Sequence, residues 1–160
     1  MRSPPPRSLF LAALLALALV QPNPADAASL PAALQAIRAV GPEGQGNAEA
    51  SRAWQELSRA QAADLPVLLA GMDGANDLAL NWLRAAIDTV TARALAAGQR
   101  LPLTELETFV RTTSHHPRAR RLAYELLAQA QPAAARQLVA GLRDDPSPEL
   151  RRDRKSTRLN

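Results

Sequence analysis

Four prolines recur at similar intervals in this chain, and each of the four opens a stretch that has the apolar spacing of a helix. Pro31, Pro66 and Pro102 each follow a leucine, and Pro132 continues the series, so that the steps are 35, 36 and 30 residues. Proline favours the first turn of a helix, where its missing N–H would have no partner in any case. This spacing constrains the fold more than any other feature, because self-similarity at such a period indicates repeated units.

Apolar residues at spacings of three and four predict helices between these signals, and no stretch alternates like a strand. The expected helices open at Ser29, Asn47, Asp64, Asn76 or Ala75, Pro102, Pro117 and Pro132, and an eighth opens at Ser147. Each repeating unit then holds two helices joined by a turn. We therefore predict an all-α fold in which antiparallel helix hairpins stack on one another.

An aromatic residue recurs in the second helix of three successive units, as Trp54, Trp82 and Tyr124. One interpretation is a stripe that binds a ligand. We favour the other interpretation, in which each ring fills the gap between stacked hairpins, because each has apolar neighbours at helical spacing.

The first 27 residues have the three parts of a secretory signal peptide. Arg2 and Arg7 charge its start, residues 9–20 form an unbroken apolar run, and small residues allow cleavage after Ala27. A helix of about 12 apolar residues rises only about 18 Å, short of the roughly 30 Å of hydrocarbon in a bilayer. We therefore disfavour an uncleaved anchor and predict an exported protein, periplasmic or extracellular, with no stable membrane anchor after cleavage.

The net charge and the absence of cysteine exclude several kinds of site. The formal net charge is +4, but residues 28–152 hold 14 Arg against 13 Asp plus Glu, so the body is close to neutral. A nucleic-acid partner is disfavoured, since such binding relies on a basic surface. The chain has no cysteine, which excludes disulfides and thiolate metal sites. We expect no cofactor.

Two stretches near the C-terminus resemble the HEAT repeat, a unit of two antiparallel helices with a breaker between them. In AAARQLVAGLRDDPSPELRRD, an apolar-striped helix is followed by Asp145-Pro146 and then by a helix that opens at Pro148. FVRTTSHHPRARRLAYELLAQ repeats the scheme with Pro117 as its breaker. Residues 28–152 as a whole also resemble the N-terminal part of large exported bacterial proteins with HEAT repeats. The resemblance implies a right-handed α-solenoid that acts as a scaffold.

The last eight residues, 153–160, break the pattern of the preceding helix. DRKSTRLN translates GATCGGAAGAGCACACGTCTGAAC, which looks like a common sequencing adapter, and it holds the only lysine, Lys155. We predict a non-native tail, and the alternative is a genuine basic, disordered one. A helical array cut at Arg152 would lack a cap, so nearby apolar residues should be less buried than their spacing indicates and the final turn should fray. These residues are Leu138, Val139, Leu142 and Leu150.

Two groups of residues are candidates for chemistry or binding. His115 and His116 precede Pro117, but a zinc site needs three or four converging ligands, so we expect no metal site and interpret the pair as a solvated helix breaker. Three arginines in the sixth helix could bind a carboxylate or phosphate of a partner, although a solvated helix face is the favoured alternative. These arginines are Arg118, Arg120 and Arg121.

Two classes of function remain open. The first is a non-catalytic scaffold or protein–protein interaction module of a larger exported protein, whose concave face binds a protein or peptide. The alternative is the helical arm of an exported enzyme whose catalytic domain lies beyond residue 152. No arrangement of residues in the sequence predicts a catalytic site, so the first class is favoured.

Overall fold

The computed structural model describes residues 24–142, 144–148 and 150–151, and these residues form an all-α fold without strands, as predicted. Their α-helices are α1 (Pro24–Arg38), α2 (Asn47–Leu57), α3 (Leu65–Ala70), α4 (Asp77–Ala96), α5 (Leu103–Arg111), α6 (Pro117–Ala130) and α7 (Pro132–Gly141). Two short 3-10 helices, η1 (Pro42–Gly44) and η2 (Ala62–Asp64), precede α2 and α3.

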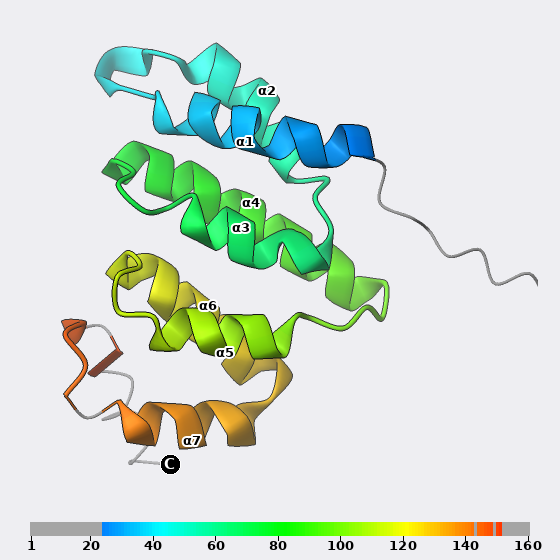
Figure 1. Cartoon of the computed structure of the whole chain (residues 1–160). Coiled ribbons are helices and arrows are strands. Elements are labelled where there is room, and N and C mark those ends of the chain that lie inside the picture. Colours follow the sequence, from blue (N-terminus) through cyan, green and yellow to red (C-terminus); the bar gives the residue numbers. More distant parts are fainter. Residues whose placement is uncertain (1–23, 143, 149, 152–160) are drawn as a thin grey trace, which may run out of the picture.

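Successive helices lie in layers, as Figure 1 shows. The α1 and α2 helices lie above α3 and α4, these lie above α5 and α6, and α7 is at the bottom. Within the layers α1 contacts α2, α3 contacts α4 and α5 contacts α6. Between the layers α2 and α1 contact α4, α3 contacts α5 and α6, and α6 contacts α7. Each helix is therefore covered both by its sequence neighbour and by helices of the adjacent layer.

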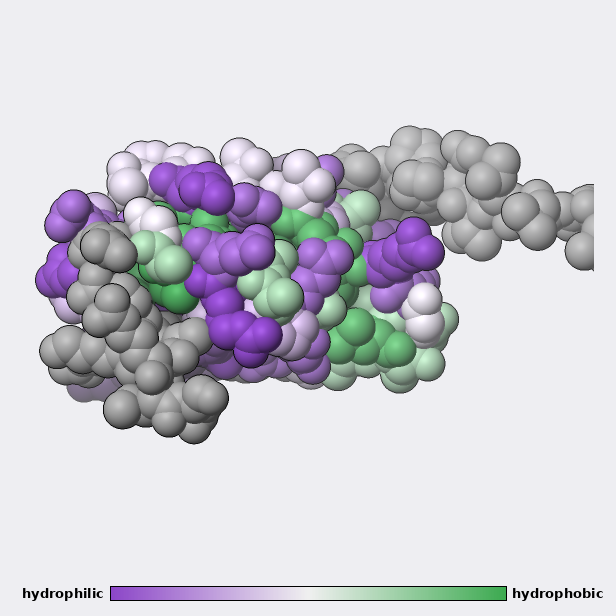
Figure 2. All heavy atoms as spheres, turned by 90° about the horizontal axis from the view of Figure 1, so that it is seen from below, coloured by the Kyte–Doolittle hydropathy of each residue, from purple (hydrophilic) through white to green (hydrophobic). Residues whose placement is uncertain are grey.

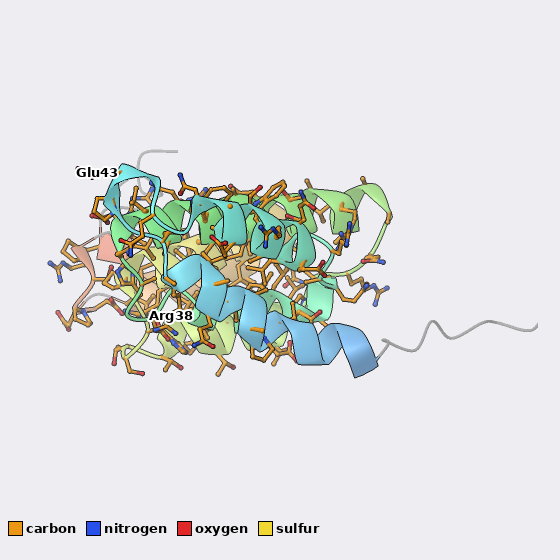
Figure 3. The ribbon with its side chains drawn as sticks, turned by 90° about the horizontal axis from the view of Figure 1, so that it is seen from above. Arg38 and Glu43 are labelled. Atoms are coloured by element: carbon orange, nitrogen blue, oxygen red, sulfur yellow. The ribbon has the colours of Figure 1, made fainter. Side chains whose placement is uncertain are left out.

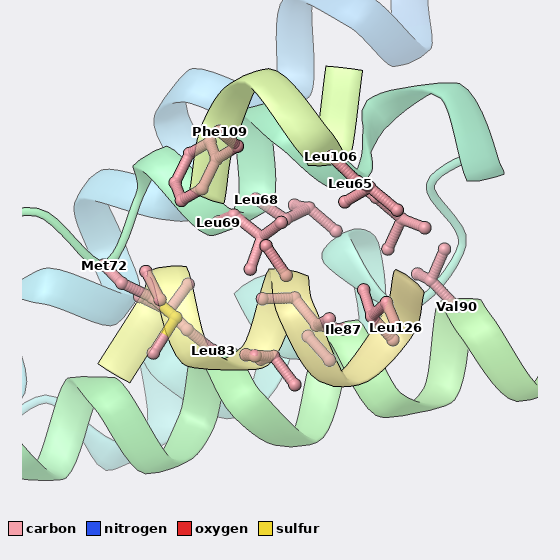
Figure 4. Close-up of a cluster of buried hydrophobic side chains, with 14 of the residues drawn as sticks. Leu65, Leu68, Leu69, Met72, Leu83, Ile87, Val90, Leu106, Phe109 and Leu126 are labelled. Carbon is pink, nitrogen blue, oxygen red and sulfur yellow. The ribbon is translucent and has the colours of Figure 1, made fainter. Parts of the chain in front are cut away.

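The short α3 helix lies at the centre of this packing. Leu65, Leu68 and Leu69 are completely buried, and Figure 4 shows them facing side chains of α4, α5 and α6. A helix of six residues is too short to be stable alone. Burial of each leucine contributes roughly 1.5–3 kcal/mol, so α3 is held by α4 of its own layer and by α5 and α6 of the next layer.

The first helix begins earlier than the sequence analysis predicts. The sequence predicts a start at Ser29, whereas α1 starts at Pro24 and Pro31 lies inside it. Pro24 supplies the same first-turn signal as Pro31, and the alanines that follow favour a helix. The expected signal peptide falls mostly on residues 1–23, outside the described residues, and cleavage after Ala27 remains a prediction.

Hydrogen bonds join the turns of the first two layers. Asn76 caps α4 by accepting a hydrogen bond from the backbone N–H of Ala79 at 2.9 Å, and its Nδ2 donates to the carbonyl of Val40 at 2.7 Å. Arg38 Nη2 donates to the carbonyl of Asp73 at 2.6 Å. Figure 3 shows Arg38 at this end of the molecule, together with Glu43 of η1. The turn after α3 is thereby fixed to the end of α1.

A second connection joins these layers away from the turns. Arg93, near the end of α4, donates from Nη1 to the carbonyl of Ser58 at 2.5 Å and from Nη2 to the carbonyl of Ala60. These carbonyls follow the last turn of α2, where they lack partners within the helix. One guanidinium thus satisfies carbonyls that the end of α2 leaves free.

The three recurring aromatics pack against the core, as predicted. Tyr124 is buried, and Trp54 and Trp82 are half-buried against the same hydrophobic cluster. The indole Nε1 of Trp54 is buried without a hydrogen-bond partner among the described residues. These rings therefore fill space between helices and do not form an open stripe.

The predicted loss of burial near the C-terminus is wrong for most of the residues concerned. Leu138, Val139 and Leu150 are buried, with exposed fractions of 3%, 2% and 0%, and only Leu142 is half-buried. The chain after α7 returns to the core, where the backbone N–H of Arg151 donates to the carbonyl of Ser147 at 3.2 Å. Up to Arg151 the final turn is therefore formed and not frayed.

The lower end of the molecule is largely hydrophilic. Figure 2 views this end from below and shows hydrophilic residues over most of it, with smaller hydrophobic patches between them. The exposed residues of α7 are Pro132, Ala133, Arg136, Gln137, Ala140 and Gly141. The described part of α7 thus turns its large apolar side chains inward and leaves two polar side chains and several small residues outward.

Candidate functional site

The three arginines of the predicted basic surface do not lie together on the surface. Arg118 is exposed and Arg121 is half-buried, but Arg120 is only 1% exposed. The prediction that Arg120 contributes to a partner-binding surface is therefore wrong. Whether Arg118 and Arg121 contact a partner remains a prediction.

Arg120 is buried because two elements on either side of α6 provide acceptors for its guanidinium. Nε and Nη2 donate to the carbonyl of Val110 at the end of α5, at 2.8 and 2.6 Å. Nη1 and Nη2 donate to the two carboxylate oxygens of Asp145 at 2.9 and 2.5 Å. A buried guanidinium is tolerated only when it is paired in this way. Arg120 therefore joins the turn after α7 to α5 and α6.

The ionisation of Asp145 is shifted by the same contacts. Burial alone would raise its pKa, but hydrogen bonds from Arg120 and from the backbone N–H of Ser147 outweigh that effect, aided by the positive charges of Arg120 and Arg151. The pKa of Asp145 consequently lies below its ordinary value of 3.8. The Asp145 carboxyl is therefore ionised at neutral pH.

Ion pairs already engage the exposed arginines of α4 and α6. Arg84 contacts Asp88 at 3.1 Å and Glu125 at 2.9 Å, and Glu125 also contacts Arg121 at 3.0 Å. These contacts form one continuous chain of alternating charge from α4 to α6. Because the charges are paired, this face carries no large excess of positive charge, so any attraction of an anionic group would depend on the donors of individual guanidinium groups and not on the net field of the face.

The Arg118 guanidinium is engaged as well. Its Nη1 lies 3.1 Å from an oxygen of Asp77, whose side chain is 92% exposed. Exposed pairs of this kind contribute about 0–1 kcal/mol to stability. Arg118 is thus the least firmly held of the arginines on α6.

The turns of the second and third layers, together with the turn after α7, line an open pocket of about 350 Å³. Its wall includes a hydrogen bond of 2.7 Å between His115 Nδ1 and Asp73 Oδ2. The other oxygen of Asp73 accepts from the backbone N–H of His116 at 2.7 Å. The lining residues are Asp73, Gly74, Thr113, Ser114, His115, His116, Pro117, Arg120, Pro146 and Ser147.

The histidine pair is held more firmly than the sequence analysis predicts. The ring of His115 stacks on Phe109 with a centroid separation of 3.8 Å, and its side chain is 23% exposed. The Nδ1 of His116 accepts from the backbone N–H of Arg118 and so caps α6. The expectation of a purely solvated breaker is therefore wrong, because Asp73 of the preceding layer binds both residues.

Sequence reasoning missed Asp73, whose contacts with His115 and His116 span 42 and 43 positions in the chain. Aligning the turns of successive units would place the turn after α3 beside the turn before α6. That alignment is the only signal in the sequence that points to this contact.

In the part of the chain that the structure describes, no group of three or more His, Cys, Asp and Glu side chains is arranged to hold a metal ion. None of the described helices combines the length and apolar character needed to cross a membrane.

In comparisons with known proteins, no protein-family model, no curated protein and no solved structure matches this chain.

Proposed function

We propose that the chain is a HEAT-like, right-handed α-solenoid and serves as a non-catalytic scaffold or protein–protein interaction module of a larger exported protein. The layers α1–α2, α3–α4 and α5–α6 would then be successive repeats. A stack of this kind presents a long surface built from several layers, and it suits the binding of another protein better than the enclosure of a substrate.

The sequence separation of the hydrogen bonds between layers carries this proposal. Arg38 and Asp73 are 35 positions apart, Asn76 and Val40 are 36 apart, and Arg93 and Ser58 are 35 apart. A separation of 33–36 residues thus recurs at both ends of the first two layers, close to the spacing of the prolines. The bonds between the second and third layers have a larger but also nearly constant separation of 41–43 residues. A nearly constant offset within each interface is what stacked repeats require, since equivalent positions of adjacent units then lie side by side.

The second helices α2, α4 and α6 provide the proposed partner-binding face. In helical-repeat arrays the second helices of successive units line one side, which offers an extended surface. Here that side carries Arg118 and Arg121, together with the ion pairs of Arg84 and Glu125. Such exposed pairs can be exchanged for contacts with a partner at little cost in stability.

The proposal is tested with two matched double variants of the exported chain. Ser51→Arg with Gln55→Arg changes α2, and Thr104→Arg with Thr108→Arg changes α5, each at exposed positions four residues apart. We expect the unmodified chain, when immobilised, to retain a defined protein from the exported fraction of the source cells. The α2 variant should lose at least tenfold in affinity for the purified partner, and the α5 variant should keep its affinity.

Equal affinities of the two double variants would contradict a binding face on the second helices. A chain that retains no exported protein at micromolar concentration would contradict the interaction function itself. Circular dichroism of both variants checks that their helices are intact.

A further inference from the structure

A small pocket opens between α4 and α6 on the proposed partner-binding face. Its volume is about 60 Å³, and it is lined by Met72, Leu80, Asn81, Arg84 and Arg118. Met72 and Leu80 are buried and form an apolar base, whereas Asn81 and the two arginines are exposed. Three side chains that donate hydrogen bonds therefore surround one cavity.

Both guanidinium groups retain donors that the protein does not use. Arg84 donates from Nε to Asp88 and from Nη2 to Glu125, and Arg118 donates from Nη1 to Asp77. Within the described part of the chain, Nη1 of Arg84 and both Nε and Nη2 of Arg118 have no acceptor. Each arginine can thus donate hydrogen bonds to a further anionic group while it keeps its present ion pair.

Of the three acids that compete for these arginines, Glu125 is the least exposed, at 33%. The side chains of Asp77 and Asp88 are well solvated, at 92% and 52% exposed. Ion pairs at such positions are weak, because water screens them and both side chains lose freedom when they pair. An incoming carboxylate that desolvates the guanidinium groups can therefore outcompete them.

We propose that this arginine pocket, formed by Asn81, Arg84 and Arg118 over Met72 and Leu80, binds the carboxylate of an acidic side chain in the partner protein. The inference rests on the proposed function, since it names the chemistry that the second-helix face recognises. A volume of about 60 Å³ has room for only a few water-sized groups. That space suits a carboxylate and its methylene, and it is too small for a nucleotide.

Nuclear magnetic resonance of the ¹⁵N-labelled chain at low ionic strength tests the proposal, with the peptide acetyl-(Glu)₆-amide as the probe. We expect the side-chain N–H signals of Asn81, Arg84 and Arg118 to shift together and to saturate. Arg84→Gln and Arg118→Gln should each weaken the affinity at least tenfold, and Arg118→Lys should weaken it less. The matched control Arg52→Gln removes the same charge from exposed α2 and should leave the affinity within twofold.

Two further titrations, one with acetate and one with inorganic phosphate, distinguish a carboxylate site from a site that binds any anion. Acetate should shift the same signals at millimolar concentration, whereas inorganic phosphate should not compete with the peptide. Competition by phosphate at equal strength would overturn the assignment to a carboxylate, and so would an equal loss of affinity in Arg118→Gln and Arg52→Gln. If the purified protein partner binds Arg84→Gln and Arg118→Gln as tightly as the unmodified chain, this inference fails while the scaffold function stands.

Discussion

At the scale of single residues, Thr91 of α4 places a polar hydroxyl in the apolar interior. It is only 4% exposed, and its Oγ1 has no hydrogen-bond partner among the described residues. Thr91→Val replaces the hydroxyl by a methyl group of similar shape and removes a desolvation cost of about 1–3 kcal/mol. We expect the variant to raise the free energy of unfolding by about 1 kcal/mol, measured by urea denaturation.

The control for this prediction is the same substitution two residues earlier. Thr89 is exposed, and its Oγ1 donates to the carbonyl of Ala85 at 2.8 Å. Thr89→Val should therefore change the free energy of unfolding by less than about 0.5 kcal/mol. A destabilised Thr91→Val would mean that the hydroxyl has a partner, such as a bound water.

A second prediction at this scale concerns the backbone conformation of Glu43. It adopts the left-handed region, with φ of 57°, in the turn between α1 and α2, and its side chain is exposed. This conformation costs a residue with a β-carbon roughly 1–2 kcal/mol, whereas glycine adopts it freely but loses more entropy on folding. We expect Glu43→Gly to raise the melting temperature slightly and Glu43→Val to lower it, as measured by thermal denaturation.

At the scale of elements, the Arg120–Asp145 pair fixes the turn after α7 to α5 and α6. Asp145→Asn leaves the buried guanidinium without its counter-charge, so we expect a loss of roughly 3–5 kcal/mol in the free energy of unfolding at pH 7. Asp144→Asn, one residue earlier and exposed, is the matched control and should cost far less.

The pH dependence of this loss follows from the lowered pKa of Asp145. A carboxyl whose pKa is lowered in the folded state contributes stability above its unfolded pKa, near 3.8, and this stability is lost as the pH falls through the folded value. The difference in unfolding free energy between the unmodified chain and Asp145→Asn should therefore be constant above about pH 5 and should narrow below it. A difference that stays the same down to pH 2 would contradict the role of the charged carboxylate.

Much of the helix pattern could be predicted from local signals, because proline and asparagine mark helix starts by their own chemistry. Asn76 caps α4, and Pro117 and Pro132 begin α6 and α7, as expected. The predicted start of α1 is wrong because Pro24 and Pro31 both carry the signal for a first helical turn. The burial of Arg120 could not be predicted, since its acceptors at Val110 and Asp145 come from other helices and turns. The spacing of the arginines on α6 predicts an exposed basic surface only if no neighbouring segment supplies a counter-charge that allows one of them to be buried.

At the scale of the whole molecule, stacked layers and a single common core predict different patterns of local unfolding when a buried side chain is truncated and leaves a cavity. In a stack, the outer layer of α1 and α2 can open while the others stay folded, because its stability depends only on its neighbour. Ile37 of α1 and Leu69 of α3 are both completely buried. Truncation of either to alanine should cost about 2–5 kcal/mol locally.

Hydrogen exchange of backbone amides distinguishes the two architectures. With Ile37→Ala we expect faster exchange in α1 and α2 and unchanged protection in α5 and α6. With Leu69→Ala protection should fall in all three layers, since the central α3 helix contacts α4, α5 and α6, and α4 in turn contacts α1 and α2. If Ile37→Ala lowered protection equally in every helix, the molecule would unfold as one cooperative unit. The offset of 35 residues between Arg38 and Asp73 would then reflect a compact bundle and not a series of repeats.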